Sequence, residues 1–353
     1  MMRLPGHFPH LIEEPMERRT FIIGAIAGGI GLLEYTMVSR WMNGMRQGGV
    51  PSVKGYERYR DRAALMAITP NEDFYVTSQG GTPRVNARQW QLKIDGLVEN
   101  PFTLNYSDLR KLPRVDKFLT LECISNPIGG NALGNAKWTG TLLKPLLERA
   151  RPGKDAAHAI FYAADGFTSG HPLERVWNDE NFLAYQMNGE DLPPDHGYPV
   201  RVFIPGKFGM KQPKWVTRIQ LVNSAYLGYW ESRGWSDTCE RWAHARFSGL
   251  EDEAKISGKN FELTGYALGN LDGIKAVELS FDDGKTWNAA SIFSNPSPLT
   301  WCFWKYVWVS PQPGTYHLRV RAIDGKGRVE GWDPRGIYPD GATGQQGLKI
   351  VVG

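Results

Sequence analysis

Cysteine is scarce in this 353-residue chain, which contains only Cys123, Cys239 and Cys302. Three thiols cannot form a disulfide framework or a four-thiolate metal site. No C-x-x-C or C-x-x-C-H motif occurs. These absences exclude thioredoxin-like redox chemistry and covalently attached c-type haem.

Glycine-rich nucleotide motifs and long basic runs are also absent. The chain has no complete G-x-G-x-x-G and no complete G-x-x-x-x-G-K-[ST], so a dinucleotide or P-loop site has no support. A net charge of +4, from 41 basic and 37 acidic residues, gives no reason to expect a nucleic-acid partner. With 41% hydrophobic residues, the chain has the composition of a packed globular protein, and its length suggests two domains.

The N-terminal residues have the pattern of an export signal. Arg18 and Arg19 are followed two places later by Phe21 and a weakly apolar run over residues 21–33. A twin-arginine signal exports folded proteins, which suits a protein that loads a cofactor first. A buried helix behind a chance arginine pair is the alternative. We expect a periplasmic or other extracytoplasmic location.

The fate of that segment stays open at this stage. No small-x-small cleavage site follows the apolar run, and residues 21–38 are near the lower length limit for a membrane span, which Glu34 weakens. An uncleaved anchor in the inner membrane and a cleaved signal are both compatible with the sequence. Residues 1–50 are therefore predicted to be a signal or membrane anchor followed by a linker.

Residues 51–243 combine signals for short strands and short helices. Residues 90–94 alternate apolar and polar, as in a half-buried strand, and residues 200–204 form a short apolar run. Ser107 is expected to cap a helical turn, and leucines at helical spacing predict a second helix over residues 142–147. These patterns predict an α+β domain.

Residues 244–353 have a different pattern. Alternating apolar and polar residues recur in several short segments, separated by Asp-Gly turns such as Asp283-Gly284. The segments are residues 261–267, 277–281, 304–309 and 316–322. Short strands at this spacing predict an all-β, immunoglobulin-like sandwich.

The residues that could carry chemistry surround Cys123. An apolar run places this cysteine just before a polar, glycine-rich loop, where one thiolate could hold a soft metal whose other ligands come from a cofactor. A buried structural thiol is the alternative. Farther along, Arg201, Lys207, Lys211 and Lys214 lie around two Pro/Gly turns and could cradle a phosphorylated cofactor, although a solvated basic loop has the same composition.

Over residues 66–335 the order of motifs resembles the sulfite oxidase family of molybdopterin enzymes. The resemblance rests on the Cys123 segment, on the Pro-Val-Arg…Pro-Gly…Gly…Lys-Trp segment of residues 199–215, and on the Ser-x-Asp-x-Gly-x-Thr-Trp hairpin of residues 280–287. The hairpin looks like the family's C-terminal dimerisation domain. The expected fold is therefore a sulfite-oxidase-type molybdopterin-binding domain followed by the sandwich, and a homodimer is expected.

The resemblance also implies a cofactor and a set of site residues. Molybdenum bound to molybdopterin is the implied cofactor, and Cys123 is the implied metal ligand and catalytic residue. The implied cofactor-binding residues are Asn71, Phe74, Tyr75, Cys123, Thr168 (or its neighbour Ser169), His196, Arg201, Gln212 and Lys214. Because no haem motif is present, the resemblance implies a separate electron carrier, either a cytochrome or a membrane haem subunit.

Three departures from the family pattern concern the substrate. Sulfite oxidases have Gly-Asn-Arg-Arg after their cysteine, whereas Ile124 and other uncharged residues follow Cys123 here. The family's Arg-Asn-His segment is replaced by Thr77-Ser78-Gln79. Trp235 falls near the position of the family's active-site tyrosine. Trp138 and Trp235 are expected to wall the pocket, with Arg233 as one remaining positive charge. Sulfite is a dianion that binds best to buried guanidinium groups.

These departures predict two-electron oxygen-atom transfer on a small molecule less anionic than sulfite, of S-oxide or N-oxide type. Sulfite oxidation remains an alternative because of Arg233. A further alternative, from another class, is an exported binding or assembly protein that keeps the fold without the cofactor.

Overall fold

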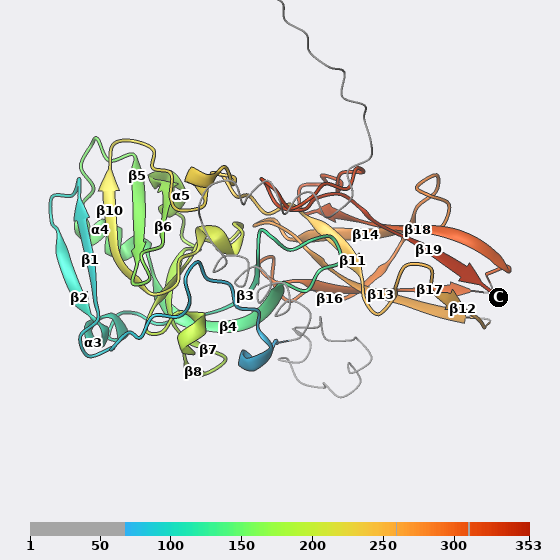
Figure 1. Ribbon diagram of the computed structural model, residues 1–353, viewed down its shortest axis with the longest axis horizontal. Coiled ribbons are helices and arrows are strands. Elements are labelled where there is room, and N and C mark those ends of the chain that lie inside the picture. The colour runs from blue at the N-terminus through green and yellow to red at the C-terminus, as the bar shows by residue number, and fades with distance from the viewer. Residues whose placement is uncertain (1–67, 259, 310) are drawn as a thin grey trace, which may run out of the picture. The chain divides into compact units, whose positions relative to one another are not determined.

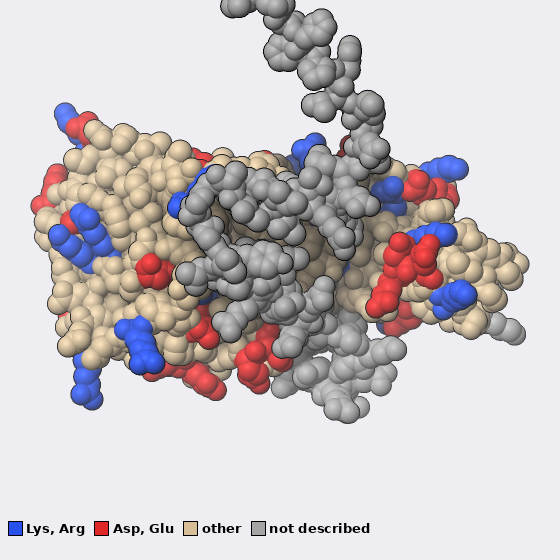
Figure 2. Space-filling model, viewed as in Figure 1, with Lys and Arg blue, Asp and Glu red and all other residues tan. Residues whose placement is uncertain are grey.

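The computed structural model describes residues 68–353 except Lys259 and Ser310, all within one compact unit of residues 45–353. The predicted signal or anchor of residues 1–50 lies outside the described residues. Within the described part, no helix is both long enough and apolar enough to cross a membrane. On the face shown in Figure 2, basic and acidic side chains of this part are interspersed.

The N-terminal half contains two five-stranded sheets. The first has the order β2-β1-β10-β5-β6, with β1 and β10 parallel and the other pairs antiparallel (Figure 1). Its strands are β1 (Gln91–Gly96), β2 (Phe102–Asn105), β5 (His158–Ala163), β6 (Thr168–Pro172) and β10 (Val216–Val222). Buried residues such as Leu92, Ile94 and Ile219 form its core.

The second sheet carries the cysteine predicted to bind metal. Its order is β3-β4-β7-β8, with β9 paired to β7. The strands are β3 (Val115–Glu122), β4 (Leu133–Leu142), β7 (Phe182–Met187), β8 (Glu190–Asp191) and β9 (Arg201–Phe203). Cys123 comes directly after β3, and Phe74, Trp138 and Phe203 lie in the core of this sheet.

The α+β prediction for this half overstates its helix content, because the described chain is mostly β. The helices are short: α3 (Tyr106–Arg110), α4 (Lys144–Ala150) and α5 (Leu173–Val176), with single 3-10 turns η3 (Asn71–Asp73), η4 (Pro194–His196), η5 (Gly209–Lys211) and η6 (Glu231–Arg233). The helix predicted near residue 145 is confirmed as α4. The predicted Ser107 cap is wrong: the Asn105 side chain accepts a hydrogen bond from the Asp108 amide and starts α3.

The C-terminal half consists of two antiparallel-rich sheets that share one core. One has the order β11-β13-β17-β16 and the other β12-β19-β18-β14-β15. Their strands are β11 (His244–Phe247), β12 (Lys255–Ile256), β13 (Asn260–Leu268), β14 (Ile274–Ser280), β15 (Asn288–Ala289), β16 (Ser291–Ser294), β17 (Cys302–Val309), β18 (Gly314–Asp324) and β19 (Gln346–Val352). Figure 1 shows β18 and β19 side by side in orange to red. The four strands predicted from alternation lie in β13, β14, β17 and β18.

Strand β3 is hydrogen-bonded to residues of the C-terminal half. The Thr120 amide donates to the Leu299 carbonyl over 3.0 Å, and the Trp301 amide donates to the Thr120 hydroxyl over 2.9 Å. The buried Arg241 guanidinium donates to the Thr120 carbonyl over 3.0 Å and to the Gly269 carbonyl. The C-terminal residues therefore help to fix the strand that ends at Cys123.

Candidate functional site

Cys123 is held in place by backbone bonds immediately after β3. Its amide donates to the Ala132 carbonyl over 2.9 Å, and its thiol is buried with 7% exposure. The Thr77 hydroxyl lies 3.9 Å from the sulfur. Burial raises the pKa of the Cys123 thiol, whereas hydrogen bonds from Ser125 and Thr77 act in the opposite direction. A bound metal ion would supply the charge that favours the thiolate.

Asn126 closes the loop that follows the cysteine. Its side-chain amide donates to Glu122 over 3.0 Å, and its side-chain oxygen accepts from the Ala132 amide over 3.0 Å. All three groups are buried, so these bonds have no competing water. The loop therefore holds Cys123 in one position.

Phe74 and Tyr75 lie between Cys123 and the basic segment. Their rings stack at a centroid distance of 5.5 Å, and Phe74 meets the His196 ring edge-on at 5.5 Å. A Cβ added to Gly209 would lie 3.0 Å from the Tyr75 hydroxyl, so the backbone of η5 approaches that hydroxyl closely. Burial, and then the neighbouring Cys123, raise the pKa of Tyr75, which keeps the hydroxyl protonated.

Arg201 is a buried cation that lacks a carboxylate partner among the described residues. Its guanidinium donates to the His196 carbonyl over 3.1 Å and lies 4.6 Å from the centre of the Phe203 ring. Its Nε has no hydrogen-bond partner in the described part of the chain. Burial lowers the pKa of Arg201 to about 10. Such an uncompensated buried charge calls for an anionic ligand.

Lys214 and the backbone of Gly197 lie beside Arg201. A Cβ at Gly197 would come within 2.9 Å of the Arg201 Cβ and 3.3 Å of the Lys214 Cβ, and Gly197 has φ of 113°. The Lys214 ammonium donates to the Asp195 carbonyl over 2.7 Å. Burial, and then the nearby Arg201, lower the pKa of Lys214 to about 7. An anion here would restore the ordinary ammonium pKa.

His196 links this basic pair to the segment around Asn71. Its Nε2 lies 3.1 Å from the Asn71 carbonyl. Burial, and then Arg201, lower the pKa of His196 to about 4, so the ring is neutral at pH 7 and can donate to that carbonyl. The neighbouring Asn188 amide donates to the Asn71 side chain over 2.9 Å.

The donor set fits the cofactor implied by the family resemblance. The buried Arg201 Nε and the Lys214 ammonium suit a phosphate, and the Cys123 sulfur suits a soft metal. Residues 68–353, apart from the two not described, contain no cluster of three or more His, Cys, Asp or Glu side chains placed to hold a metal. A metal bound by one protein thiolate, with its other ligands supplied by an organic cofactor, is compatible with this arrangement.

Two other predicted cofactor residues have side chains that are already hydrogen-bonded within the protein. Gln212 accepts from the Ile204 amide over 3.1 Å and donates to the Lys207 carbonyl over 2.8 Å, so both ends of its side chain are used within the turn. The Thr168 hydroxyl accepts from the Tyr226 hydroxyl over 3.0 Å. Their contacts with a cofactor stay predictions.

The predicted substrate residues are not all placed together. Trp138 is fully buried, and its indole donates to the Leu119 carbonyl over 3.1 Å, so it is a core residue beneath Phe74 rather than a pocket wall. Trp235 packs against a buried cluster of Ile124, Phe208 and Cys239, in which Ile124 is the residue after Cys123. Arg233 is exposed, and its guanidinium lies 3.6 Å from the centre of the Tyr229 ring.

Two residues near this site were not predicted to take part in it. Thr77 was predicted only as a departure from the family pattern, although its hydroxyl lies 3.9 Å from the Cys123 sulfur. Asp165 lies close enough to act on Lys214, and burial raises the pKa of Asp165. No local motif marks either residue, because both contacts join segments far apart in the chain.

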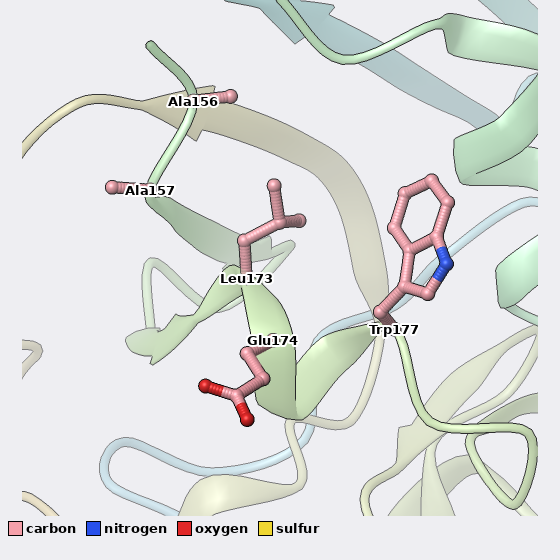
Figure 3. Close-up of a pocket in the computed structure, with 5 residues that line it drawn as sticks. All are labelled: Ala156, Ala157, Leu173, Glu174 and Trp177. Atoms are coloured by element: carbon pink, nitrogen blue, oxygen red, sulfur yellow. The ribbon is translucent and has the colours of Figure 1, made fainter. Parts of the chain in front are cut away.

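A separate surface hollow contains none of the predicted site residues. It is open, has a volume of about 390 Å³ and is lined by Ala156, Ala157, Leu173, Glu174 and Trp177 (Figure 3). These residues come from α5, from Trp177 just after it, and from the segment before β5. The hollow therefore belongs to the outside of the first sheet.

Comparison with known proteins identifies two domain families in the chain. Residues 79–230 match the oxidoreductase molybdopterin binding domain, and residues 246–335 match the Mo-co oxidoreductase dimerisation domain. Both lie within the predicted domains, 51–243 and 244–353, whose boundaries stay predictions.

Similar proteins include oxidoreductases from distant organisms. The chain is 29% identical to sulfite oxidase of Arabidopsis thaliana, covering 67% of this chain and 73% of that protein. It is 27% identical to nitrate reductase [NADPH] of Aspergillus niger, covering 77% of this chain but only 40% of that protein. An uncharacterized oxidoreductase of Bacillus subtilis is 30% identical, and the match covers 51% of this chain and 92% of that protein.

Among solved structures, the sulfane dehydrogenase SoxCD from Paracoccus pantotrophus has the same fold, with a TM-score of 0.71 at 23% identity. The match covers 80% of this chain and 81% of that chain. The fold and the donor set thus define a molybdopterin-dependent oxidoreductase. The chain belongs to the sulfite oxidase family, and its cofactor is molybdenum bound to molybdopterin.

Proposed function

We propose that this enzyme transfers an oxygen atom to or from a small substrate less anionic than sulfite, of S-oxide or N-oxide type. The observation that carries the proposal is the lack of arginine in the segment after Cys123 and at position 77, beside its sulfur. Ile124-Ser125-Asn126-Pro127 follows the cysteine where the family pattern has Gly-Asn-Arg-Arg. Thr77 stands where the family pattern begins Arg-Asn-His, and its hydroxyl approaches the Cys123 sulfur.

The nearby arginines with described contacts are engaged elsewhere. Arg241 donates to the Thr120 and Gly269 carbonyls, and Arg201 lies in the basic cradle beside Lys214. Arg233 is held on Tyr229 by ring contact and by a hydrogen bond to its carbonyl over 2.6 Å. Each missing charged hydrogen bond would weaken binding of sulfite by about 1.5–3 kcal/mol.

The protein side chains have separable roles in this function. When bound, the molybdenum cofactor supplies the two-electron oxygen-atom transfer. Cys123 holds the metal, Arg201 and Lys214 bind the phosphate, and the Phe74 and Tyr75 rings keep water away. The protonated Tyr75 hydroxyl is a hydrogen-bond donor beside Cys123.

The test is a steady-state comparison of sulfite oxidation with S-oxide and N-oxide reduction by the molybdenum-loaded enzyme. Saturable reduction of a neutral oxide, with little sulfite oxidation, is the expected result. Efficient sulfite oxidation would favour the second candidate, a sulfite oxidase in which the exposed Arg233 turns toward the substrate. Metal and pterin analysis of the same sample verifies that the cofactor is loaded.

We also propose an exported, extracytoplasmic location, on the basis of Arg18, Arg19 and the apolar run after them, with tethering to the inner membrane if the segment is uncleaved. We propose that the enzyme exchanges electrons with a separate cytochrome or membrane haem subunit.

The C-terminal half is proposed to be immunoglobulin-like and to form a homodimer, supported by the family match of residues 246–335. Cell fractionation of the full-length protein and light scattering of the purified enzyme test these proposals.

A further inference from the structure

A buried ion pair joins two turns beside the candidate site. The Lys211 ammonium lies 2.7 Å from a Glu231 carboxylate oxygen, with side-chain exposures of 1% and 0%. The Ser169 hydroxyl donates to the same carboxylate oxygen over 3.1 Å, and Asp237 lies 3.2 Å from the ammonium. The pair thus connects η5, β6 and the segment that begins with η6.

The pair is an unexpected feature for stability alone. The second oxygen of Glu231 is buried and has no hydrogen-bond partner among the described residues. Desolvating two charges costs free energy that their contacts recover only in part when one carboxylate oxygen has no partner, so an apolar pair of similar volume is often at least as stable.

At the lysine end, the pair is anchored to the wall of the cofactor site. Lys211 is the last residue of η5, which begins at Gly209, and the backbone there approaches the Tyr75 hydroxyl and the Glu122 carbonyl. The Lys211 carbonyl is 2.8 Å from the buried His171 Nε2. The ammonium therefore projects from a turn whose own position is fixed relative to the end of β3.

At the glutamate end, the pair holds the segment that carries the predicted substrate residues. Glu231 begins η6, which includes Arg233, and Gly234 follows with φ of 88°. The Trp235 amide donates back to the Trp230 carbonyl over 3.2 Å, and the Trp235 side chain packs against the buried cluster of Ile124, Phe208 and Cys239. The backbone turn passes close to Thr168, because a Cβ at Gly228 would lie 2.3 Å from its carbonyl oxygen.

We propose that Lys211 and Glu231 are positioning residues: their buried ion pair fixes residues 228–237 against the cofactor site and so sets where Trp235 and Arg233 lie relative to Cys123. The inference rests on the proposed function, since it concerns the selectivity of that same site. The pair contacts neither metal nor substrate. Its loss should alter substrate discrimination more than cofactor content.

The experiment compares the molybdenum-loaded enzyme with Lys211→Met, Glu231→Gln and the double variant. The double variant leaves no lone buried charge, so it is the variant expected to fold. Lys144→Met is the matched control, because it removes a lysine that pairs over 2.8 Å with Asp179 on the surface. Trypsin cleavage after the exposed Arg233, followed by mass spectrometry, reports the mobility of the segment without any assay of activity.

We expect the double variant to retain molybdenum and pterin while its cleavage after Arg233 accelerates at least about tenfold. The ratio of kcat/KM for a neutral oxide to that for sulfite should change by at least about tenfold, mainly through KM. Lys144→Met should leave all three measurements unchanged. Unchanged cleavage and unchanged discrimination would overturn the proposal, as would loss of cofactor with discrimination intact. If no variant or parent holds molybdenum, the proposed function fails, whereas the cleavage result still decides the role of the pair.

Discussion

At the scale of single residues, the candidate site depends on one sulfur atom and two cations. Cys123 is placed by its own backbone bond to Ala132, and Arg201 is buried without a carboxylate partner among the described residues. A buried guanidinium without such a partner is expensive in a protein that binds nothing at this position. Each side chain should therefore have a large effect on cofactor content.

Replacing the sulfur tests the metal assignment directly. Cys123→Ser removes the soft ligand but keeps the size and the backbone bonds. We expect most of the molybdenum to be lost, and turnover with it, as measured by metal analysis and steady-state kinetics on the same preparation. Cys302→Ala is the control, because Cys302 is buried in the C-terminal core. A serine variant with undiminished molybdenum and turnover would refute the proposed ligation.

Lys214 predicts a pH dependence of stability in protein prepared without cofactor. Its pKa is about 7 in the fold against 10.5 for an ordinary lysine, because of burial and then of Arg201. Between these values the unfolded chain carries the extra proton, so raising the pH stabilises the fold. Relative to Lys214→Met, the wild-type free energy of unfolding should rise from pH 7 to about pH 10.5. Urea titrations across that range measure the difference, and the highly exposed Lys111→Met should give no such trend.

At the scale of elements, the loop after β3 is closed by one side chain. Asn126→Ala would leave the buried Ala132 amide without its acceptor and Glu122 without a donor. We expect the free energy of unfolding to fall by about 1–3 kcal/mol, seen as a lower urea midpoint at constant slope.

The control for that loop is an exposed asparagine. Asn100→Ala removes a surface hydrogen bond to the Arg149 carbonyl, and its effect should stay within about 0.5 kcal/mol. Equal losses in the two variants would contradict the role given to Asn126.

Element types could be predicted where the side-chain pattern was long and regular. Residues 261–267 and 316–322 alternate clearly and lie in β13 and β18, as expected. The N-cap residue of α3 could not be predicted in the same way, because Asn105 and Ser107 are both good N-cap residues. The choice between them depends on where the chain leaves β2. Trp138 illustrates another limit: its burial depends on pairing between β3 and β4, which no local pattern records.

Site residues that lie within one sequence motif could be predicted, whereas contacts between distant segments could not. Arg201 and Lys214 lie in one recognisable segment, and the structure brings them together beside Gly197. The ion pair of Lys211 and Glu231 joins residues 20 positions apart through two irregular turns, and the Thr77 hydroxyl reaches Cys123 across 46 positions. Such contacts depend on tertiary packing, so they had no signal in the sequence.

At the scale of the whole molecule, Arg241 connects the strand that ends at Cys123 to the C-terminal half. Arg241→Met would leave the Thr120 and Gly269 carbonyls without their charged donor. We expect a loss of about 3 kcal/mol or more in the free energy of unfolding. Unfolding transitions followed by circular dichroism and by tryptophan fluorescence should then separate, whereas those of the wild type coincide.

An exposed arginine provides the comparison. Arg114→Met removes a surface ion pair with Asp116, with side-chain exposures of 58% and 36%, and should leave the transitions superimposed. Coincident transitions in Arg241→Met, with a loss no larger than in Arg114→Met, would show that the two halves do not depend on this guanidinium.

The bonds between Thr120 and residues 299 and 301 also determine when the enzyme can be assembled. A chain still emerging from the ribosome has made Cys123 long before it makes Trp301. Until then β3 lacks its hydrogen bonds to residues 299 and 301, and the binding site for the pterin is incomplete. We therefore expect the cofactor to be inserted only after residues 299–301 have been made, and a chain terminated before them should not retain the metal.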